Sequence, residues 1–241
     1  MLDNSIIWSL WWLAKYHIHH FMVLAGFKRP SCLVVTGMIG CGKTTVQRKI
    51  EGLPGVHSAP ECSDPAEFWR VLTELPSGCK EREDFLFRTC SDKCRNMMSR
   101  QRVPSLTVFD RFAMDSVYFA TLGNYWSEEN YAEAMELEGT NLRAKCDVKI
   151  FIVDFARPED HLEILKTRLA RSFSDEKEAK VRASEVGNYD WQSHLECSFA
   201  IRHFMLCMGY DSSHITHLVK QSNSAEEHSR VFRTILTKAI Q

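Results

Sequence analysis

A glycine-rich turn between an apolar run and a helix-compatible stretch is the feature that most constrains how this 241-residue chain folds. The segment SCLVVTGMIGCGKTTVQRKI, residues 31–50, contains G-x-x-x-x-G-K-[ST] without a gap, from Gly37 to Thr44. Glycines let the backbone curl so that successive N–H groups point inward, and the helix that follows adds the positive end of its dipole. In this context the motif predicts a turn that holds a nucleoside triphosphate.

Two side chains after the glycines suit the same ligand. Lys43 can reach the β- and γ-phosphates, and the Thr44 hydroxyl can ligate Mg²⁺. The motif alone leaves GTPases, ATPases and small-molecule kinases open, but the chain has no convincing N-K-x-D sequence for reading guanine. We therefore expect ATP and Mg²⁺ as cofactors. The predicted nucleotide-binding residues are Gly37, Met38, Ile39, Gly40, Cys41, Gly42, Lys43, Thr44 and Thr45.

The order of apolar runs predicts the fold class. Strand-like runs lie at 31–36, 105–109 and 148–153, with a weaker run at 55–60. Helix-compatible stretches separate them, at 43–51, 65–75, 81–101, 112–121, 127–143 and 159–171. Short β-rich runs alternating with helices predict an α/β fold, in which a parallel sheet is flanked by helices on both faces. We expect residues 31–241 to form one such P-loop domain.

Residues 1–30 are an apolar and aromatic extension, interrupted by Lys15, His17, His19 and His20. The longest uncharged run is too short to span a bilayer comfortably. The segment also lacks the basic start of a signal peptide and the arginines of a mitochondrial presequence. Three interpretations remain open: a packed extra helix, an interfacial helix on a membrane or a partner, or a disordered extension.

Composition adds two limits. The formal charge of −1 gives no general argument for binding nucleic acid. The nine cysteines are scattered and have no metal-type spacing, and Cys90 and Cys94 are interpreted as small buried hydrophobes. Such cysteine usage indicates a reducing compartment, so we expect an intracellular, cytoplasmic protein.

A second chemical signal follows the strand-like run at 105–109. In LTVFDRFAMDSVYFA, Asp110 and Arg111 stand at the carboxyl end of that strand, where an open α/β sheet forms its ligand crevice. A carboxylate there can hold Mg²⁺ directly or through water. The neighbouring guanidinium can bridge the donor phosphate and the acceptor oxygen. We therefore predict Thr44 and Asp110 as the metal-binding residues.

These motifs resemble the deoxynucleoside kinase family, which includes cellular deoxycytidine and deoxyguanosine kinases, an insect enzyme and certain viral thymidine kinases. The similarity runs from about Ser31 to His203. It covers the glycine turn, a glutamate with a tryptophan downstream, the helix core FLFRT, the Asp-Arg pair and the arginines of LKTRLARS; the carrying residues are Glu61, Trp69, Phe85, Thr89, Asp110, Arg111, Arg168 and Arg171.

The resemblance implies an ATP-dependent transfer of phosphate to a deoxynucleoside 5′-hydroxyl, of thymidine or deoxycytidine kinase type, by a homodimer with an arginine-bearing lid. If the chain is viral, its compartment is the host cytoplasm. Glu61 would be the general base. The implied catalytic residues are Glu61, Arg111, Lys43, Arg168 and Arg171, and the implied substrate-binding residues are Glu61, Trp69, Phe85, Arg88, Arg111 and Glu176.

Departures from the family pattern leave alternatives open. Arg88 replaces the glutamine that reads the base, and arginine has no acceptor with which to reproduce that contact. Arg88 is either a surface residue paired with Asp92 or a group facing the site. The charged stretch SFSDEKEAKVR beyond the lid arginines is expected to be mobile. Two other functions are kept: a thymidylate-type nucleoside monophosphate kinase, in which Arg88 meets the acceptor phosphate, and a non-catalytic ATP-binding regulatory protein.

Overall fold

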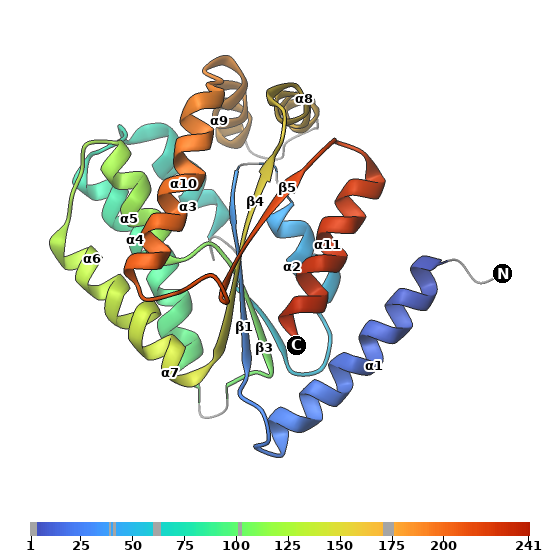
Figure 1. The fold of residues 1–241 in the computed structure, drawn as a ribbon. Helices are drawn as coiled ribbons and strands as arrows, with labels where there is room; N and C mark the ends of the chain where they lie inside the picture. Colours follow the sequence, from blue (N-terminus) through green and yellow to red (C-terminus); the bar gives the residue numbers. More distant parts are fainter. Residues whose placement is uncertain (1–3, 39, 41, 60–63, 101–102, 171–175) are drawn as a thin grey trace.

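Parallel strands form a single sheet at the centre of the chain, in the order β2-β3-β1-β4-β5 (Figure 1). The computed structural model describes residues 4–38, 40, 42–59, 64–100, 103–170 and 176–241. Within these residues the strands are β1 (Ser31–Gly37), β2 (Val56–Ala59), β3 (Leu106–Asp110), β4 (Asp147–Phe155) and β5 (Ile215–Lys220). The prediction of an α/β P-loop fold with a helix-flanked parallel sheet is confirmed.

The register of the central strands brings the chemical motifs together. β1 lies between β3 and β4, with Val35 opposite Asp110 and Gly37 opposite Val153. Every residue of β1 and β3 is buried, as expected for strands covered on both faces. The glycine turn after β1 and the Asp-Arg pair after β3 therefore lie at the same edge of the sheet.

Helices cover both faces of the sheet (Figure 1). One core cluster joins the sheet to α4 (Lys80–Met98), α5 (Ala113–Leu122) and α10 (Trp191–Cys207). The other joins it to α1 (Asn4–Leu24), α2 (Lys43–Ile50) and α11 (Ala225–Ala239). The remaining helices are α3 (Pro65–Glu74), α6 (Glu128–Ala134), the π-helix η1 (Met135–Leu142), α7 (Arg143–Lys145), α8 (Pro158–Leu169) and α9 (Glu176–Gly187).

The N-terminal extension forms α1, a helix that packs by one face. Trp12 and Tyr16 are buried, and the Trp12 indole N–H donates to the carbonyl of Leu236 in α11 at 2.9 Å. His19 is also buried, with Nε2 3.1 Å from the carbonyl oxygen of Ser105. None of the helices in the described residues combines the length and apolar character needed to cross a bilayer.

Three parts of the chain differ from the sequence interpretation. β5 and the helices α10 and α11 were not predicted. The helical stretch expected at 127–143 divides into α6, η1 and α7. The described part of the charged stretch, 176–182, belongs to α9, in which Arg182 pairs with Glu178 at 3.4 Å and with Glu185 at 2.6 Å.

Candidate active site

The glycine turn has the backbone that its sequence requires. Gly37, Gly40 and Gly42 have φ values of 109°, 80° and 99°, a region that favours glycine. At Gly37 the lack of a side chain is also needed for packing, since a β-carbon there would stand 2.4 Å from the carbonyl oxygen of Val153. Ile39 and Cys41 lie outside the described residues. The turn thus passes directly from β1 to the first turn of α2.

Lys43, the first residue of α2, is buried and folds back over the turn. Its Nζ donates to the carbonyl oxygens of Gly37 and Met38, at 3.4 and 3.2 Å. The amine is therefore held above the backbone that would surround a phosphate. Thr45 lies in the first turn of α2, and its N–H donates to the Gly42 carbonyl at 3.1 Å.

Thr44 and Asp110 bring together the two oxygens predicted to hold a metal. The Thr44 hydroxyl donates to Oδ2 of Asp110 at 3.2 Å, and the Asp110 side chain is buried. The main-chain carbonyl of Asp110 accepts from Lys93 Nζ of α4 at 2.9 Å, which anchors the end of β3. A hydroxyl and a carboxylate are the hard oxygen ligands that Mg²⁺ prefers alongside phosphate oxygens, so these residues fit the ion.

Arg111 follows in a conformation that side chains rarely adopt. Its φ is 67°, and its guanidinium lies over the ring of Phe119, 4.8 Å from the centroid. Such strain at a non-glycine residue persists only when the surroundings impose it, and it is concentrated at functional sites. Arg111 follows the end of β3, at the same edge of the sheet as Lys43.

Asp115 is a residue that the sequence analysis missed. It connects the turn at Arg111 and Phe112 to β1. Its Oδ2 accepts from the Phe112 N–H at 3.1 Å and from the Thr36 hydroxyl at 2.8 Å. Thr36 immediately precedes Gly37. Burial raises the pKa of Asp115, while the Arg111 guanidinium opposes the rise. An acid in the first turn of a helix is a known start signal, so this contact had a local signature.

Glu138 of η1 binds the start of α5, directly after the turn at Arg111 and Phe112. Its carboxylate accepts from the N–H groups of Ala113 and Met114, the first residues of α5, at 2.6 and 3.1 Å. Burial raises its pKa to about 8, since the two hydrogen bonds only partly offset the loss of water. No local signal in the sequence could have revealed this residue, because its partners are more than twenty positions away.

Glu138 is expected to make the protein less stable as the pH rises. Its folded pKa of about 8 lies above the ordinary 4.5, so the folded chain holds the proton more tightly. Its stabilising contribution is complete below pH 4.5 and is lost as the pH rises through 8. Because one pH unit of pKa displacement corresponds to about 1.4 kcal/mol, the loss should exceed that value.

Urea unfolding of the wild type and of Glu138→Gln across this pH range measures the effect. The difference between the two free energies of unfolding should shrink, or change sign, as the pH rises. The control is Glu136→Gln, an exposed glutamate of η1, for which the difference should not vary with pH. A pH-independent difference for Glu138→Gln would show that the carboxylate is ionised when folded.

The lid contributes one predicted arginine to the turn. Arg168, near the end of α8, has Nη1 3.8 Å from the point where a β-carbon on Gly40 would stand. Ile164 approaches the same point to 2.6 Å, so α8 lies directly against the turn. Arg171 lies outside the described residues. The described part of the predicted lid therefore places one cation beside the glycines.

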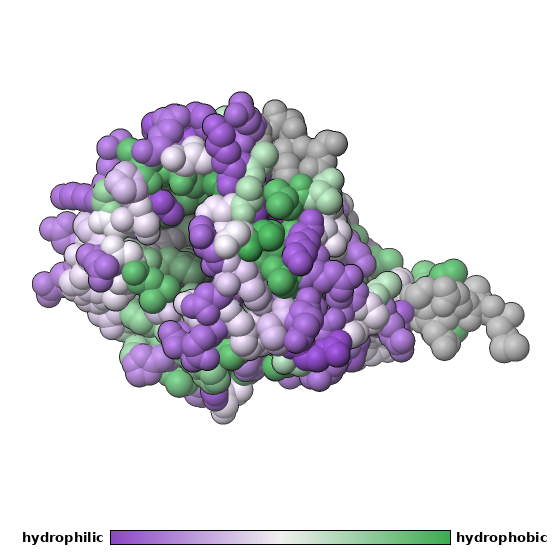
Figure 2. All heavy atoms as spheres, turned by 90° about the horizontal axis from the view of Figure 1, so that it is seen from above, coloured by the Kyte–Doolittle hydropathy of each residue, from purple (hydrophilic) through white to green (hydrophobic). Residues whose placement is uncertain are grey.

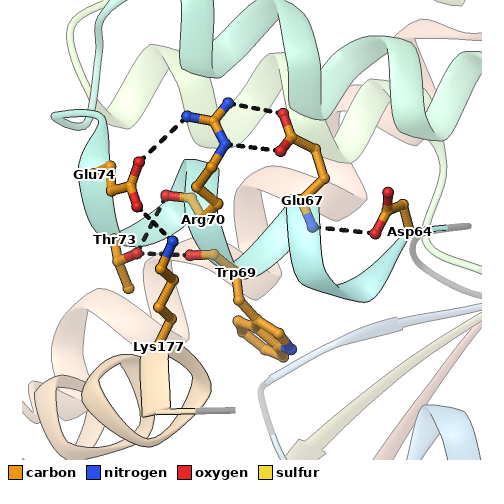
Figure 3. Close-up of polar contacts among 7 residues, drawn as sticks. All are labelled: Asp64, Glu67, Trp69, Arg70, Thr73, Glu74 and Lys177. Atoms are coloured by element: carbon orange, nitrogen blue, oxygen red, sulfur yellow. Dashed lines mark hydrogen bonds and ion pairs between the residues drawn. The ribbon is translucent and has the colours of Figure 1, made fainter.

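Trp69 is covered by a residue of α9. The guanidinium of Arg182, from α9, lies 4.8 Å from its ring centroid. A second contact joins the same two helices, because Lys177 of α9 pairs with Glu74 of α3 at 2.5 Å (Figure 3). Glu176, the first residue of α9, is exposed and pairs with Lys180 at 3.2 Å. These two contacts between α3 and α9 were not predicted from the sequence.

The other predicted substrate residues lie on α4, and Glu61 lies outside the described residues. Phe85 is partly buried. Arg88 is exposed, and its Nε donates to the Asp84 carbonyl of its own helix at 3.2 Å. Asp92, considered above as its partner, pairs instead with Arg95 at 2.6 Å. The expected pairing of Arg88 with Asp92 is therefore absent, and its role at the site stays a prediction.

Lys220 is a further cation that the sequence analysis missed. It ends β5, its side chain is buried, and Nζ lies 3.6 Å from the point where a β-carbon on Gly42 would stand. It was missed because β5 was not predicted, so nothing placed residue 220 at the carboxyl edge of the sheet. The edge thus carries cations from α2, β5 and α8 as well as Arg111.

Comparison with known proteins supports the fold. No family model and no curated protein matches the sequence. Polyphosphate kinase 2 from Arthrobacter aurescens TC1 superposes with a TM-score of 0.54 at 15% identity, over 99% of this chain and 80% of that one. Deoxyadenosine kinase from M. mycoides gives 0.48 at 12% identity, over 86% and 99%. Thymidylate kinase from Candida albicans gives 0.47 at 12%, over 88% and 94%.

Proposed function

We propose that the protein is an ATP-dependent phosphotransferase that phosphorylates the 5′-hydroxyl of a deoxynucleoside, of thymidine or deoxycytidine kinase type. The observation that carries the proposal is the grouping of Lys43, Thr44, Asp110 and Arg111 at one edge of the sheet, around a turn whose glycines have positive φ. Phosphoryl transfer needs little covalent help from a protein, so positioning and charge neutralisation at such a site supply most of the catalysis.

Each described residue has a role in this reaction. The backbone of the turn and Lys43 would bind the β- and γ-phosphates. Thr44 and Asp110 would hold Mg²⁺, which when bound neutralises charge on the phosphate oxygens. Arg168, which lies beside the turn, would stabilise the charge on the transferring group. Arg111 would do the same from the end of β3, where its backbone N–H donates to the Val35 carbonyl of β1 at 3.3 Å. The turn and the Asp-Arg pair are braced together by the Thr36–Asp115 hydrogen bond.

The acceptor side of the reaction rests on the family resemblance. The hydroxyl oxygen would form a bond to the γ-phosphorus while the bond from that phosphorus to the β–γ bridging oxygen breaks. The hydroxyl proton would pass to Glu61, leaving ADP and a deoxynucleoside monophosphate. Trp69 and Phe85 are the proposed contacts to the base, and the Arg182 guanidinium lies over the Trp69 ring in this structure.

A panel of acceptors tests the proposal. The purified protein is incubated with Mg²⁺, ATP labelled at the γ-position and each of the four natural deoxynucleosides. Thymidylate is a separate arm, and ADP with inorganic polyphosphate is another, because one similar structure is a polyphosphate kinase. We expect label in the monophosphate of at least one deoxynucleoside, identified by chromatography.

The other outcomes contradict the proposal in distinguishable ways. Labelled thymidine diphosphate from thymidylate, without any product from nucleosides, would indicate a nucleoside monophosphate kinase. ATP formed only from ADP and polyphosphate would indicate a polyphosphate kinase. Tight ATP binding with no transfer to any acceptor would indicate a regulatory nucleotide-binding protein.

A further inference from the structure

The outward face of α1 is an apolar stripe that the rest of the described chain does not cover. The stripe consists of the exposed residues Ile7, Leu10, Trp11, Ala14, Ile18 and Phe21. Leu10, Ile18 and Phe21 are 60%, 64% and 64% exposed. Trp12 and Tyr16, on the opposite face, are buried, so α1 is apolar on both sides.

The stripe is continuous rather than a scatter of single side chains. Its members recur three or four positions apart, which places them on one side of a helix over about 21 Å. Figures 1 and 2 show the start of α1 projecting from the body of the molecule. Ile6, Leu24 and Phe27, at the two ends of α1 and just after it, are exposed as well. The other large exposed apolar side chains in the described residues are Leu122, Trp126, Phe199 and Leu206.

The charges around the stripe are of one sign. Residues 4–30 contain no aspartate or glutamate, and the cation on α1 is Lys15. Lys28 and Arg29 follow the helix, and their side chains donate to the carbonyl oxygens of Gln241 and Arg143. The Lys15 amine lies over the ring of Trp11 at 4.3 Å, so its stem follows the edge of the stripe. An apolar helix face that is bordered by a lysine and a tryptophan, and that lacks acidic residues, matches the boundary between acyl chains and anionic headgroups.

The same charges disfavour a second copy of this chain as the occupant. A two-fold pairing centred on Ala14 would bring the two Lys15 side chains together. No acidic residue on α1 is present to neutralise them, and like charges across an interface oppose association.

We infer that α1 docks on an anionic lipid surface, with the stripe at the acyl boundary and Lys15 among the headgroups. The helix lies along the surface and does not cross it. The inference does not depend on the proposed reaction. In Figure 1, α1 joins β1 at the amino end of the sheet, so the glycine turn at the opposite edge stays accessible to nucleotide.

Co-sedimentation of the full-length protein with lipid vesicles tests the inference. Vesicles of phosphatidylcholine alone are compared with vesicles that also contain phosphatidylserine, at low and high salt. We expect stronger binding to the vesicles with phosphatidylserine, weakened by salt, and a loss of about fivefold or more in bound protein for the double variant L10S/F21S.

The matched control is F199S/L206S, which removes two exposed apolar side chains from α10, where Phe199 is as exposed as Phe21. It should bind vesicles like the wild type. Thermal unfolding of both variants checks that they fold, as expected for substitutions of exposed side chains. Sedimentation velocity measures self-association without lipid.

Three results would overturn the inference. The wild type could fail to bind phosphatidylserine vesicles, or L10S/F21S could bind them as well as the wild type. A dimer that L10S/F21S dissociates, in a protein that binds no vesicles, would instead identify a second copy as the occupant. None of these readouts requires turnover, so they are separate from the test of phosphoryl transfer.

Discussion

Replacing Lys43 with alanine is expected to lower kcat/KM for phosphoryl transfer by about a thousandfold or more. The amine is buried and already held over the turn by the carbonyls of Gly37 and Met38. A cation fixed in a site that excludes water stabilises developing negative charge more strongly than one in solvent. Alanine removes that charge, and a coupled assay of ADP release measures the loss.

The control for this variant lies on the same helix. Lys49→Ala removes an exposed lysine of α2 whose amine lies over the ring of Phe232 at 4.3 Å, on the side of the helix that packs toward α11. It should keep the wild-type rate. Circular dichroism and thermal unfolding of both variants establish that they are folded. A Lys43→Ala enzyme within tenfold of the wild-type rate would remove this amine from the mechanism.

Arg111→Gly is expected to separate catalysis from stability. Glycine adopts the φ of 67° without the cost of about 1–2 kcal/mol that other residues pay in the left-handed region. That relief acts against two losses: the contact with Phe119, about 0.5–1 kcal/mol for a cation over an aromatic ring, and the charge interaction with the buried Asp115 carboxyl. The fold should therefore change little in stability. In contrast, kcat should fall by about 10²–10³-fold, because the guanidinium is gone.

Asn124→Gly is the matched control, because Asn124 is an exposed residue with a φ of 61°. Its free energy of unfolding in urea should rise, because glycine removes the cost of the left-handed backbone, and its kcat should not change. ATP binding by Arg111→Gly should persist, since the turn and Lys43 are unchanged. If Arg111→Gly kept its kcat, the left-handed turn would have no catalytic purpose. If it unfolded, the role of the guanidinium would be structural.

The parts of the site that could be predicted are those whose signal is local in the sequence. The glycine turn was recognised because a motif of eight residues stands between a strand and a helix. Asp110 and Arg111 were placed at the same edge because parallel strands end on one side of a sheet, and the Thr44–Asp110 hydrogen bond agrees with that reasoning. Several helix and strand positions could also be predicted, because apolar runs are local signals in the sequence.

The parts that could not be predicted depend on distant segments. β5 is an edge strand with only part of its surface buried, so it lacks the continuous apolar run of β1. Arg182 reaches Trp69 only because α9 folds onto α3, and nothing in either segment indicates the other. Glu138 is buried by the packing of η1 against α5. A charge-rich helix or a lone glutamate looks solvent-exposed until its tertiary partner is known.

Some predictions still rest on the resemblance alone. Glu61 and Arg171 lie outside the described residues, and their roles stay predictions, as does the expectation of a homodimer. Arg88 is exposed, and its predicted contact with the acceptor stays a prediction as well.

The pairing of the first helix with the last has a consequence for synthesis on the ribosome. Trp12 and the carbonyl of Leu236 that it binds are 224 positions apart. The inner aromatic face of α1 is therefore synthesised long before the helix that covers it. β1 likewise waits for β4, its neighbour in the sheet. The nascent chain thus carries a doubly apolar helix until α11 has been made, and chaperones or a nearby bilayer can engage that helix before the domain closes.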